Sequence, residues 1–176
     1  MSKKLIVVIN GRGASGKDTC IGFIPRDKYK IMNTSSIDPI KEAAGVLGWN
    51  GVKTKEARKF LSDMKKLSVS FNDFPVKYIT MMYNEFLSSD NDIMFIHVRE
   101  PKEIEKIVNT IPNVVTLLVK RDLIGELGND ADDNVEDYNY DIIFENNGTK
   151  QEAEINFNKL IDSIYNGSVT STETNL

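Results

Sequence analysis

A glycine-rich stretch that directly follows an apolar run constrains this chain more than any other feature. The run Leu5-Ile6-Val7-Val8-Ile9 leads into a stretch that fits the pattern G-x-x-x-x-G-K. Its residues are Gly11, Arg12, Gly13, Ala14, Ser15, Gly16, Lys17, Asp18 and Thr19. In this pattern glycines let a tight loop turn backbone N–H groups toward phosphate oxygens, while the lysine reaches the terminal phosphates. A buried strand before the stretch and a helix starting near Lys17 are the context that predicts a phosphate-binding loop.

Asp18 departs from the usual form of the pattern. That place commonly holds Ser or Thr, whose hydroxyl meets Mg²⁺, and here Thr19 comes one position later. A carboxylate repels a nearby triphosphate unless a metal lies between them. Asp18 therefore either holds Mg²⁺, through water, or points away as a first-turn helix residue, and both readings stay open.

Length and composition predict one domain of about 166 residues with an ample core. The chain has 176 residues, a net charge of −4 and a single cysteine, Cys20. With no basic excess, we expect no binding of polymeric DNA or RNA. One cysteine makes no internal disulfide, which fits a reducing cytoplasm. The apolar run near the start is too short for a signal segment or a membrane span, so we expect a cytoplasmic protein without membrane association.

Apolar runs alternate with helical patterns along most of the chain. Strands are expected over about 29–33, 93–96, 114–119 and 142–144, in addition to 5–9. Helices are expected over 17–23, 38–48 and 149–165, and from Thr54, Pro75 and Pro101 onward. About five strands alternating with helices predict an α/β fold with a doubly wound parallel sheet and helices on both faces. The site should lie above the carboxyl ends of the strands.

Several local signals refine this plan. Asp38 and Pro39 look like the N-cap and first residue of a helix, which would place Ser35, Ser36, Asp38 and Lys41 near a strand end. Thr54 is expected to cap a helix whose basic residues, Lys55, Arg58, Lys59, Lys65 and Lys66, form mostly a solvated face. The insertion over about 37–90 is long enough to be an acceptor-binding subdomain. Residues 121–141 hold eight acids against one base, Arg121, so a mobile loop or lid is expected over 121–140. Residues 167–176 are expected to be a disordered tail.

Four stretches together resemble the deoxynucleoside monophosphate kinases typical of phages and, more distantly, the animal-type phosphomevalonate kinases of the same P-loop group. They are residues 16–19, residues 38–41, residues 98–103, and residues 140–143 leading to Asn147-Gly148-Thr149. The G-K-x-T form of the first is also similar to adenylate kinase. The likeness covers most of residues 4–165 and implies the P-loop kinase fold.

This resemblance also implies an activity, cofactors and site residues. The loop around Lys17 would hold ATP with Mg²⁺, and the acceptor would be a nucleoside monophosphate or deoxynucleoside monophosphate. Lys17, Arg99 and Arg121 would be catalytic, with the two arginines on phosphates. The acceptor would meet Ser36, Asp38, Lys41, Arg58, His97 and Arg99. Two departures matter: His97 stands where such kinases often carry Asp, and the lid is poor in arginine.

Other functions remain alternatives. A switch GTPase would need N-K-x-D, which does not occur, so the D-x-x-G of residues 122–125 is attributed to chance. A kinase of another small phosphorylated metabolite, such as phosphomevalonate, and a non-catalytic nucleotide-binding module both stay open. Formation of ADP that depends on an added acceptor would distinguish a kinase from a non-catalytic nucleotide-binding module. The oligomeric state is also open, with a homodimer among the alternatives.

Overall fold

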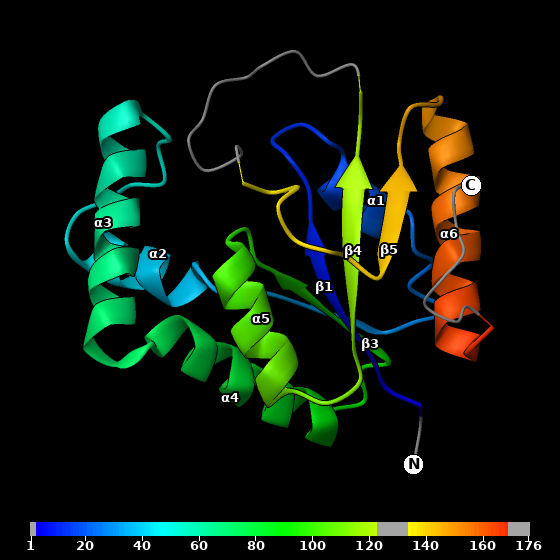
Figure 1. The fold of residues 1–176 in the computed structure, drawn as a ribbon, viewed down its shortest axis with the longest axis horizontal. Helices are drawn as coiled ribbons and strands as arrows, with labels where there is room; N and C mark the ends of the chain where they lie inside the picture. Colours follow the sequence, from blue (N-terminus) through cyan, green and yellow to red (C-terminus); the bar gives the residue numbers. More distant parts are fainter. Residues whose placement is uncertain (1–2, 123–133, 169–176) are drawn as a thin grey trace.

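The computed structural model describes residues 3–122 and 134–168, and these residues form a five-stranded sheet flanked by helices (Figure 1). The strands are β1 (Leu5–Asn10), β2 (Ile31–Ser35), β3 (Ile93–His97), β4 (Val114–Lys120) and β5 (Ile142–Glu145). The helices are α1 (Lys17–Gly22), α2 (Asp38–Val46), α3 (Lys55–Asn72), α4 (Phe74–Ser88), α5 (Pro101–Thr110) and α6 (Lys150–Asn166).

The sheet has the order β2-β3-β1-β4-β5, and every neighbouring pair is parallel. The central strand β1 is buried along its whole length, as its unbroken apolar sequence requires of a strand covered on both faces. Because all strands run the same way, their carboxyl ends meet at one edge, where the glycine-rich stretch begins after Asn10. The predicted α/β fold, with about five parallel strands and helices on both faces, is confirmed.

Two hydrophobic layers lie on opposite faces of the sheet. On one face, α1 and α6 bury Ile21 and Phe157 against alternate strand residues such as Val7 and Phe95. On the other, α4 and α5 bury side chains such as Phe86 and Ile104 against the intervening strand residues. This alternation follows from the two-residue period of a strand, and it makes the sheet the rigid base of the loops at its edge.

Two helix starts agree with their sequence signals, and one differs. Thr54 caps α3 by accepting a hydrogen bond from the Ala57 amide at 3.1 Å, and Thr149 and Glu152 form a complete capping box on α6. The expectation that Asp38 caps its helix is wrong, because α2 includes Asp38 and Ile37 precedes it. The Asp38 carboxylate instead accepts a hydrogen bond from the Ser35 amide at 2.8 Å.

Other boundaries shift by small amounts. Strand β2 runs over Ile31–Ser35, two residues later than expected, and α2 ends at Val46 instead of near Gly48. Both shifts lie at the ends of elements, where sequence signals are weakest. Most of the predicted lid, residues 123–133, and the predicted tail from residue 169 lie outside the described residues.

Helix α3 lies at the side of the molecule, away from the sheet (Figure 1). It contacts α2 and α4, and none of its residues is buried. Its apolar side chains Leu67 and Phe71 are 69% and 85% exposed. Helix α4, by contrast, buries Ile79 and Phe86 in the core. Of the three helices between β2 and β3, α4 is therefore built into the core of the domain and α3 projects from it.

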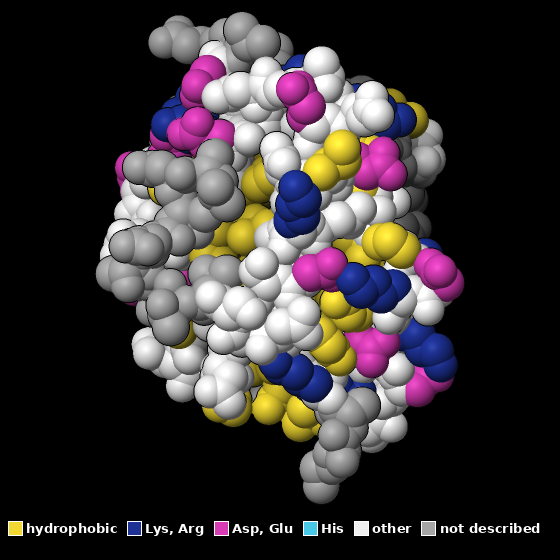
Figure 2. Space-filling model, turned by 90° about the vertical axis from the view of Figure 1, so that its right-hand side faces the viewer, with side chains coloured by type: hydrophobic (Ala, Val, Ile, Leu, Met, Phe, Trp, Pro, Cys, Tyr) yellow, Lys and Arg dark blue, Asp and Glu magenta, His cyan; other side chains and the backbone are white. Residues whose placement is uncertain are grey.

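The surface carries charges of both signs. On the face shown in Figure 2, acidic and basic side chains are interspersed among the described residues instead of gathering by sign. Within the described ranges, no helix is both long and apolar enough to cross a membrane.

Candidate functional site

The glycine-rich loop connects the end of β1 to the start of α1 and is closely packed at two glycines. A Cβ on Gly11 would overlap Ser15 Oγ and lie 2.7 Å from the Val119 carbonyl oxygen. A Cβ on Gly16, whose φ of +88° is left-handed, would lie 2.5 Å from Asn146 Nδ2. Backbone therefore passes where no side chain fits, as a loop that binds phosphate through its main chain requires.

One hydroxyl inside this loop has no protein partner. Ser15 Oγ is buried and makes no hydrogen bond within the described residues. A buried polar atom without a partner costs free energy, and such atoms often mark a place completed by a ligand or water. Together with the two glycines, this fits a phosphate group held against the loop, so ATP is compatible with the residues present.

Two asparagines at strand ends hold the loop in place. Asn10 accepts a hydrogen bond from the Gly11 amide at 2.8 Å and donates to the Arg99 carbonyl at 3.1 Å. It also donates to the Tyr140 hydroxyl at 2.7 Å. At the other end of the loop, Asn146 donates to the Ser15 carbonyl at 2.8 Å. The loop is thus tied to the segments after β3 and β5, which makes it preorganised for an anion.

A cluster of polar side chains lies at the first turn of α1 and consists of Lys17, Asp18 and His97. The Asp18 Oδ1 atom lies 3.5 Å from Lys17 Nζ and 3.7 Å from His97 Nδ1. Lys17 is only 17% exposed, whereas the Asp18 side chain is 78% exposed. The carboxylate therefore lies on the side of the helix that carries Lys17, and it does not point away from the loop.

Oxygen donors suited to Mg²⁺ are present at this turn. Asp18 and Thr19 are both exposed, and Mg²⁺ commonly takes one or two protein oxygens while keeping several waters. No group of three or more His, Cys, Asp and Glu residues that could form a metal cage occurs within the described part of the chain. Asp18 and Thr19 are thus both candidates to hold a Mg²⁺ ion that arrives with a nucleotide.

His97 is neutral at physiological pH. Burial of the imidazole lowers its pKa below the ordinary value of 6.5, and the nearby Lys17 ammonium group lowers it further. A neutral imidazole can accept a proton or a hydrogen bond, which an imidazolium cannot.

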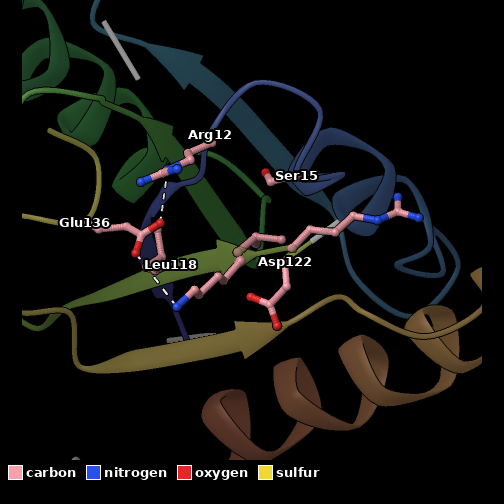
Figure 3. A pocket seen from close by; sticks show the side chains of 8 residues that line it. Arg12, Ser15, Leu118, Asp122 and Glu136 are labelled. Carbon is pink, nitrogen blue, oxygen red and sulfur yellow. Dashed lines mark ion pairs between the residues drawn. The ribbon is translucent and has the colours of Figure 1, made fainter. Parts of the chain in front are cut away.

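A pocket of about 240 Å³ opens beside the loop (Figure 3). It is lined by Arg12, Ser15, Leu118, Val119, Lys120, Arg121, Asp122 and Glu136. Glu136 Oε1 lies 3.0 Å from Arg12 Nε, and Glu136 Oε2 lies 3.8 Å from Lys120 Nζ. On its outer side, the Asp122 carboxylate accepts a hydrogen bond from Asn147 Nδ2 at 2.7 Å. Three basic side chains thus share one pocket with the phosphate loop, and one carboxylate bridges two of them.

The residues expected to meet the acceptor lie mainly at the ends of β2 and β3. The Ser36 amide donates to the His97 carbonyl at 3.3 Å, and Asp38 pairs with Lys41 at 3.2 Å. Arg99 is exposed just beyond β3, on the segment tied to Asn10. Arg58 lies apart on α3, where its Nε donates to the Lys53 carbonyl at 3.4 Å. Arg121 is in the pocket beside the loop.

Sequence reasoning missed residues that hold the site together. Lys65 does not belong to a solvated face, because its side chain is 12% exposed and its ammonium group lies 2.6 Å from both Glu100 Oε2 and Glu103 Oε2. Asn10 and Asn146 were also missed. A polar residue at the end of an otherwise apolar strand was the available signal for both asparagines, while nothing in the helical pattern distinguished Lys65 from Lys66.

Comparison with known proteins yields fold relatives only. No protein-family model matches the sequence, and no curated protein matches it. The solved structure of TT1252 from Thermus thermophilus is similar, with 14% identity, a TM-score of 0.52, and coverage of 93% of this chain and 99% of that one. The structure of APE1195 has 14% identity and a TM-score of 0.50, covering 94% and 98%. A mutant of the APS kinase CysC from Mycobacterium tuberculosis covers 93% and 100% at 9% identity, with a TM-score of 0.49. The likeness to TT1252 and APE1195 indicates a common fold and leaves the activity to the site.

Proposed function

We propose that this protein transfers the γ-phosphate of ATP to a nucleoside monophosphate or deoxynucleoside monophosphate. The observation that carries the proposal is the placement of Lys17, on a loop too tight for side chains at Gly11 and Gly16, beside the strand ends that bear Ser36 and His97. A donor bound to the loop and an acceptor bound at those strand ends would meet at the carboxyl edge of the sheet, where folds of this class bind ligands.

On the donor side, the loop backbone and Lys17 bind the phosphates. Arg12, Lys120 and Arg121 surround the neighbouring pocket and add positive charge. Mg²⁺ bound with ATP would neutralise phosphate oxygens, and Asp18 would hold it there. Phosphoryl transfer depends mainly on positioning and on stabilising charge, so this concentration of cations supports the proposed reaction.

On the acceptor side, Arg99 and Lys41 would bind the acceptor's phosphate, and Ser36 and Asp38 would bind its polar groups. Neutral His97 can accept a hydrogen bond from the acceptor or from the water around it. A strong general base is not required, because the transition state of phosphoryl transfer is loose and the nucleophile is itself a phosphate oxygen. Arg58 would reach the acceptor from the projecting helix α3.

Two alternatives keep a specific observation in their favour. The acidic Glu136 bridges Arg12 and Lys120, which offsets the positive charge that catalysis needs and suits a non-catalytic nucleotide-binding module. The second alternative, a kinase of another small phosphorylated metabolite such as phosphomevalonate, is supported by the more distant resemblance of the same four stretches to phosphomevalonate kinases. We rank the nucleoside monophosphate kinase first, because the four resembling stretches include residues from both sides of the site.

A coupled assay of ADP formation over a panel of acceptors tests the proposal. The panel contains the ribonucleoside and deoxyribonucleoside monophosphates, phosphomevalonate and a no-acceptor control, each with ATP and Mg²⁺. ADP formation that requires one of the monophosphates supports the proposal. Turnover with phosphomevalonate and with none of the nucleoside monophosphates would instead indicate a kinase of another small phosphorylated metabolite. Binding of ATP with no acceptor-dependent ADP would leave a binding module.

A further inference from the structure

An ion cluster joins the projecting helix α3 to the start of α5, with two of its side chains largely buried and the third, Glu100, 55% exposed. Its cation is Lys65, on α3. Its anions are Glu100, the residue directly before α5, and Glu103, in the first turn of α5. Lys65 Nζ also lies 3.4 Å from Ser36 Oγ, just past the end of β2. Lys65 and Glu103 are 12% and 9% exposed, although α3 has no residue that counts as buried.

Stability alone does not explain why these charges are enclosed. Removing charges from water costs several kcal/mol per ion, and the attraction between them often only balances that cost. This cluster has one cation and two carboxylates, and Glu103 Oε1 is buried without a hydrogen-bond partner in the described residues. Burial raises the pKa of Glu103 against the opposing effect of Lys65. An apolar contact at the same place would hold the helices together at lower cost.

The position of the cluster distinguishes it from the other tie between these helices. Lys106, on α5, pairs with Asp73 at the far end of α3 at 2.7 Å, but both side chains are substantially exposed. The Lys65 cluster lies at the other end of α5, where Arg99 directly precedes Glu100 and Ser36 marks the end of β2. It therefore links α3, which carries Arg58, to the two strand ends that carry acceptor-side residues.

We propose that Lys65 is a positioning residue for the acceptor: its bonds to Glu100 and Glu103 set α3, and Arg58 with it, at a fixed place relative to Arg99 and Ser36. This inference rests on the proposed function, because it assigns the cluster a part in binding the acceptor. The ion pairs of Lys65 go to α5 and not to Lys17, so we expect the effect of the cluster to be larger on the acceptor side than on the ATP side.

The test is a comparison of steady-state constants in four variants of the full chain. Lys65→Met should raise the KM for the acceptor at least tenfold while the KM for ATP stays within twofold of wild type. Lys65→Arg should recover most of the loss, since it keeps a cation in place. Glu103→Gln should raise the acceptor KM by a smaller factor. Lys66→Met, the same change on the exposed neighbouring residue, should alter neither constant.

Lys65→Met leaves two carboxylates unpaired and should lower the melting temperature. The double variant Lys65→Met with Glu103→Gln removes one of those charges, and it provides the same comparison if the single variant does not fold. An acceptor KM within twofold of wild type in the folded variant would overturn the inference. Equal rises in the KM for ATP and for the acceptor would also overturn it, because they would show a general structural defect.

The outcome also separates this inference from the proposed function. If the wild-type protein forms no ADP with any acceptor, the proposed function fails, and amide hydrogen exchange then tests the cluster itself. Exchange in α3 should be faster in Lys65→Met than in Lys66→Met, with α6 unchanged in both. Equal protection of α3 in the two variants would show that Lys65 does not position the helix.

Discussion

Glu136 and Arg12 form a 3.0 Å ion pair across the pocket beside the phosphate loop, and the same carboxylate faces Lys120. A carboxylate that bridges two cations neutralises positive charge that would otherwise attract the phosphates of ATP. Glu136→Gln should therefore tighten ATP binding by up to about fivefold, since partly exposed pairs of this kind contribute about 1 kcal/mol or less. Calorimetry measures the change, with Glu154→Gln on the outer face of α6 as control. Weaker binding in Glu136→Gln would mean that the carboxylate supports Arg12 instead of competing for it.

Lys17→Ala should leave a folded protein whose kcat falls by orders of magnitude. The lysine charge acts most strongly as the phosphoryl group moves, and its side chain has no part in the hydrophobic layers. Turnover under saturating ATP and acceptor, together with the melting temperature, provides the measurement. Lys159→Ala on α6 is the control for loss of one charge. Near-normal turnover in Lys17→Ala would contradict the central assignment.

Arg99→Ala should lower kcat/KM for the acceptor roughly a hundredfold, or about 3 kcal/mol, with little change in melting temperature. A guanidinium group binds phosphate oxygens through two parallel donors, so Arg99→Lys should restore only part of the loss. If Arg99 were only a surface residue, its exposed ion pairs would contribute at most about 1 kcal/mol. Activity within threefold of wild type in both variants would remove Arg99 from the site.

His97 is the only histidine of the chain, so its titration can be followed by NMR without ambiguity. Its pKa should lie below 6.5, rise in Lys17→Met and fall in Asp18→Asn, because Lys17 disfavours and Asp18 favours the charged imidazole. Well above pH 6.5 the imidazole is neutral in both the native and unfolded states, and its titration does not affect stability. As pH falls below 6.5, only the unfolded state takes up the proton, so the native protein loses stability. His97→Gln should reduce that loss on the acid side, and a native pKa above 6.5 would refute the assignment.

Truncation of an aliphatic side chain to alanine should affect stability very differently at a buried position and at an exposed one. Ile104 on α5 is fully buried, and Ile104→Ala should lower the free energy of unfolding by about 2–5 kcal/mol. Leu67 on α3 is 69% exposed, and Leu67→Ala should change it by about 0.5 kcal/mol or less. Urea denaturation compares the two variants. A large loss in Leu67→Ala would show that the outer face of α3 is covered in solution.

The parts of the structure that follow local rules could be predicted from the sequence. The apolar run before the glycines, the Thr54 cap and the capping box at Thr149 each depend on residues within a few positions, and all three are present. Alternation of strands and helices was enough for the fold class. Asp38 was wrongly predicted to be an N-cap because its carboxylate accepts a hydrogen bond from the Ser35 amide, three residues earlier, instead of capping α2.

The parts that depend on how elements cross could not be predicted. Lys65 and Lys66 are chemically identical, and only the angle at which α3 meets α5 decides which one reaches Glu103. Asn10 is joined to Tyr140 through a contact between residues 130 apart in the chain. The phosphate loop itself was found by its spacing, but the residues that hold its shape come from distant segments.

The bond from Asn146 to Ser15 has a consequence for the order in which the protein matures. The residue that packs against Gly16 is synthesised 131 positions after Ser15. A growing chain that lacks β5 has every residue of the loop and lacks the contact that shapes it. Nucleotide affinity should thus arise only after Asn146 has been synthesised and β5 has joined the sheet.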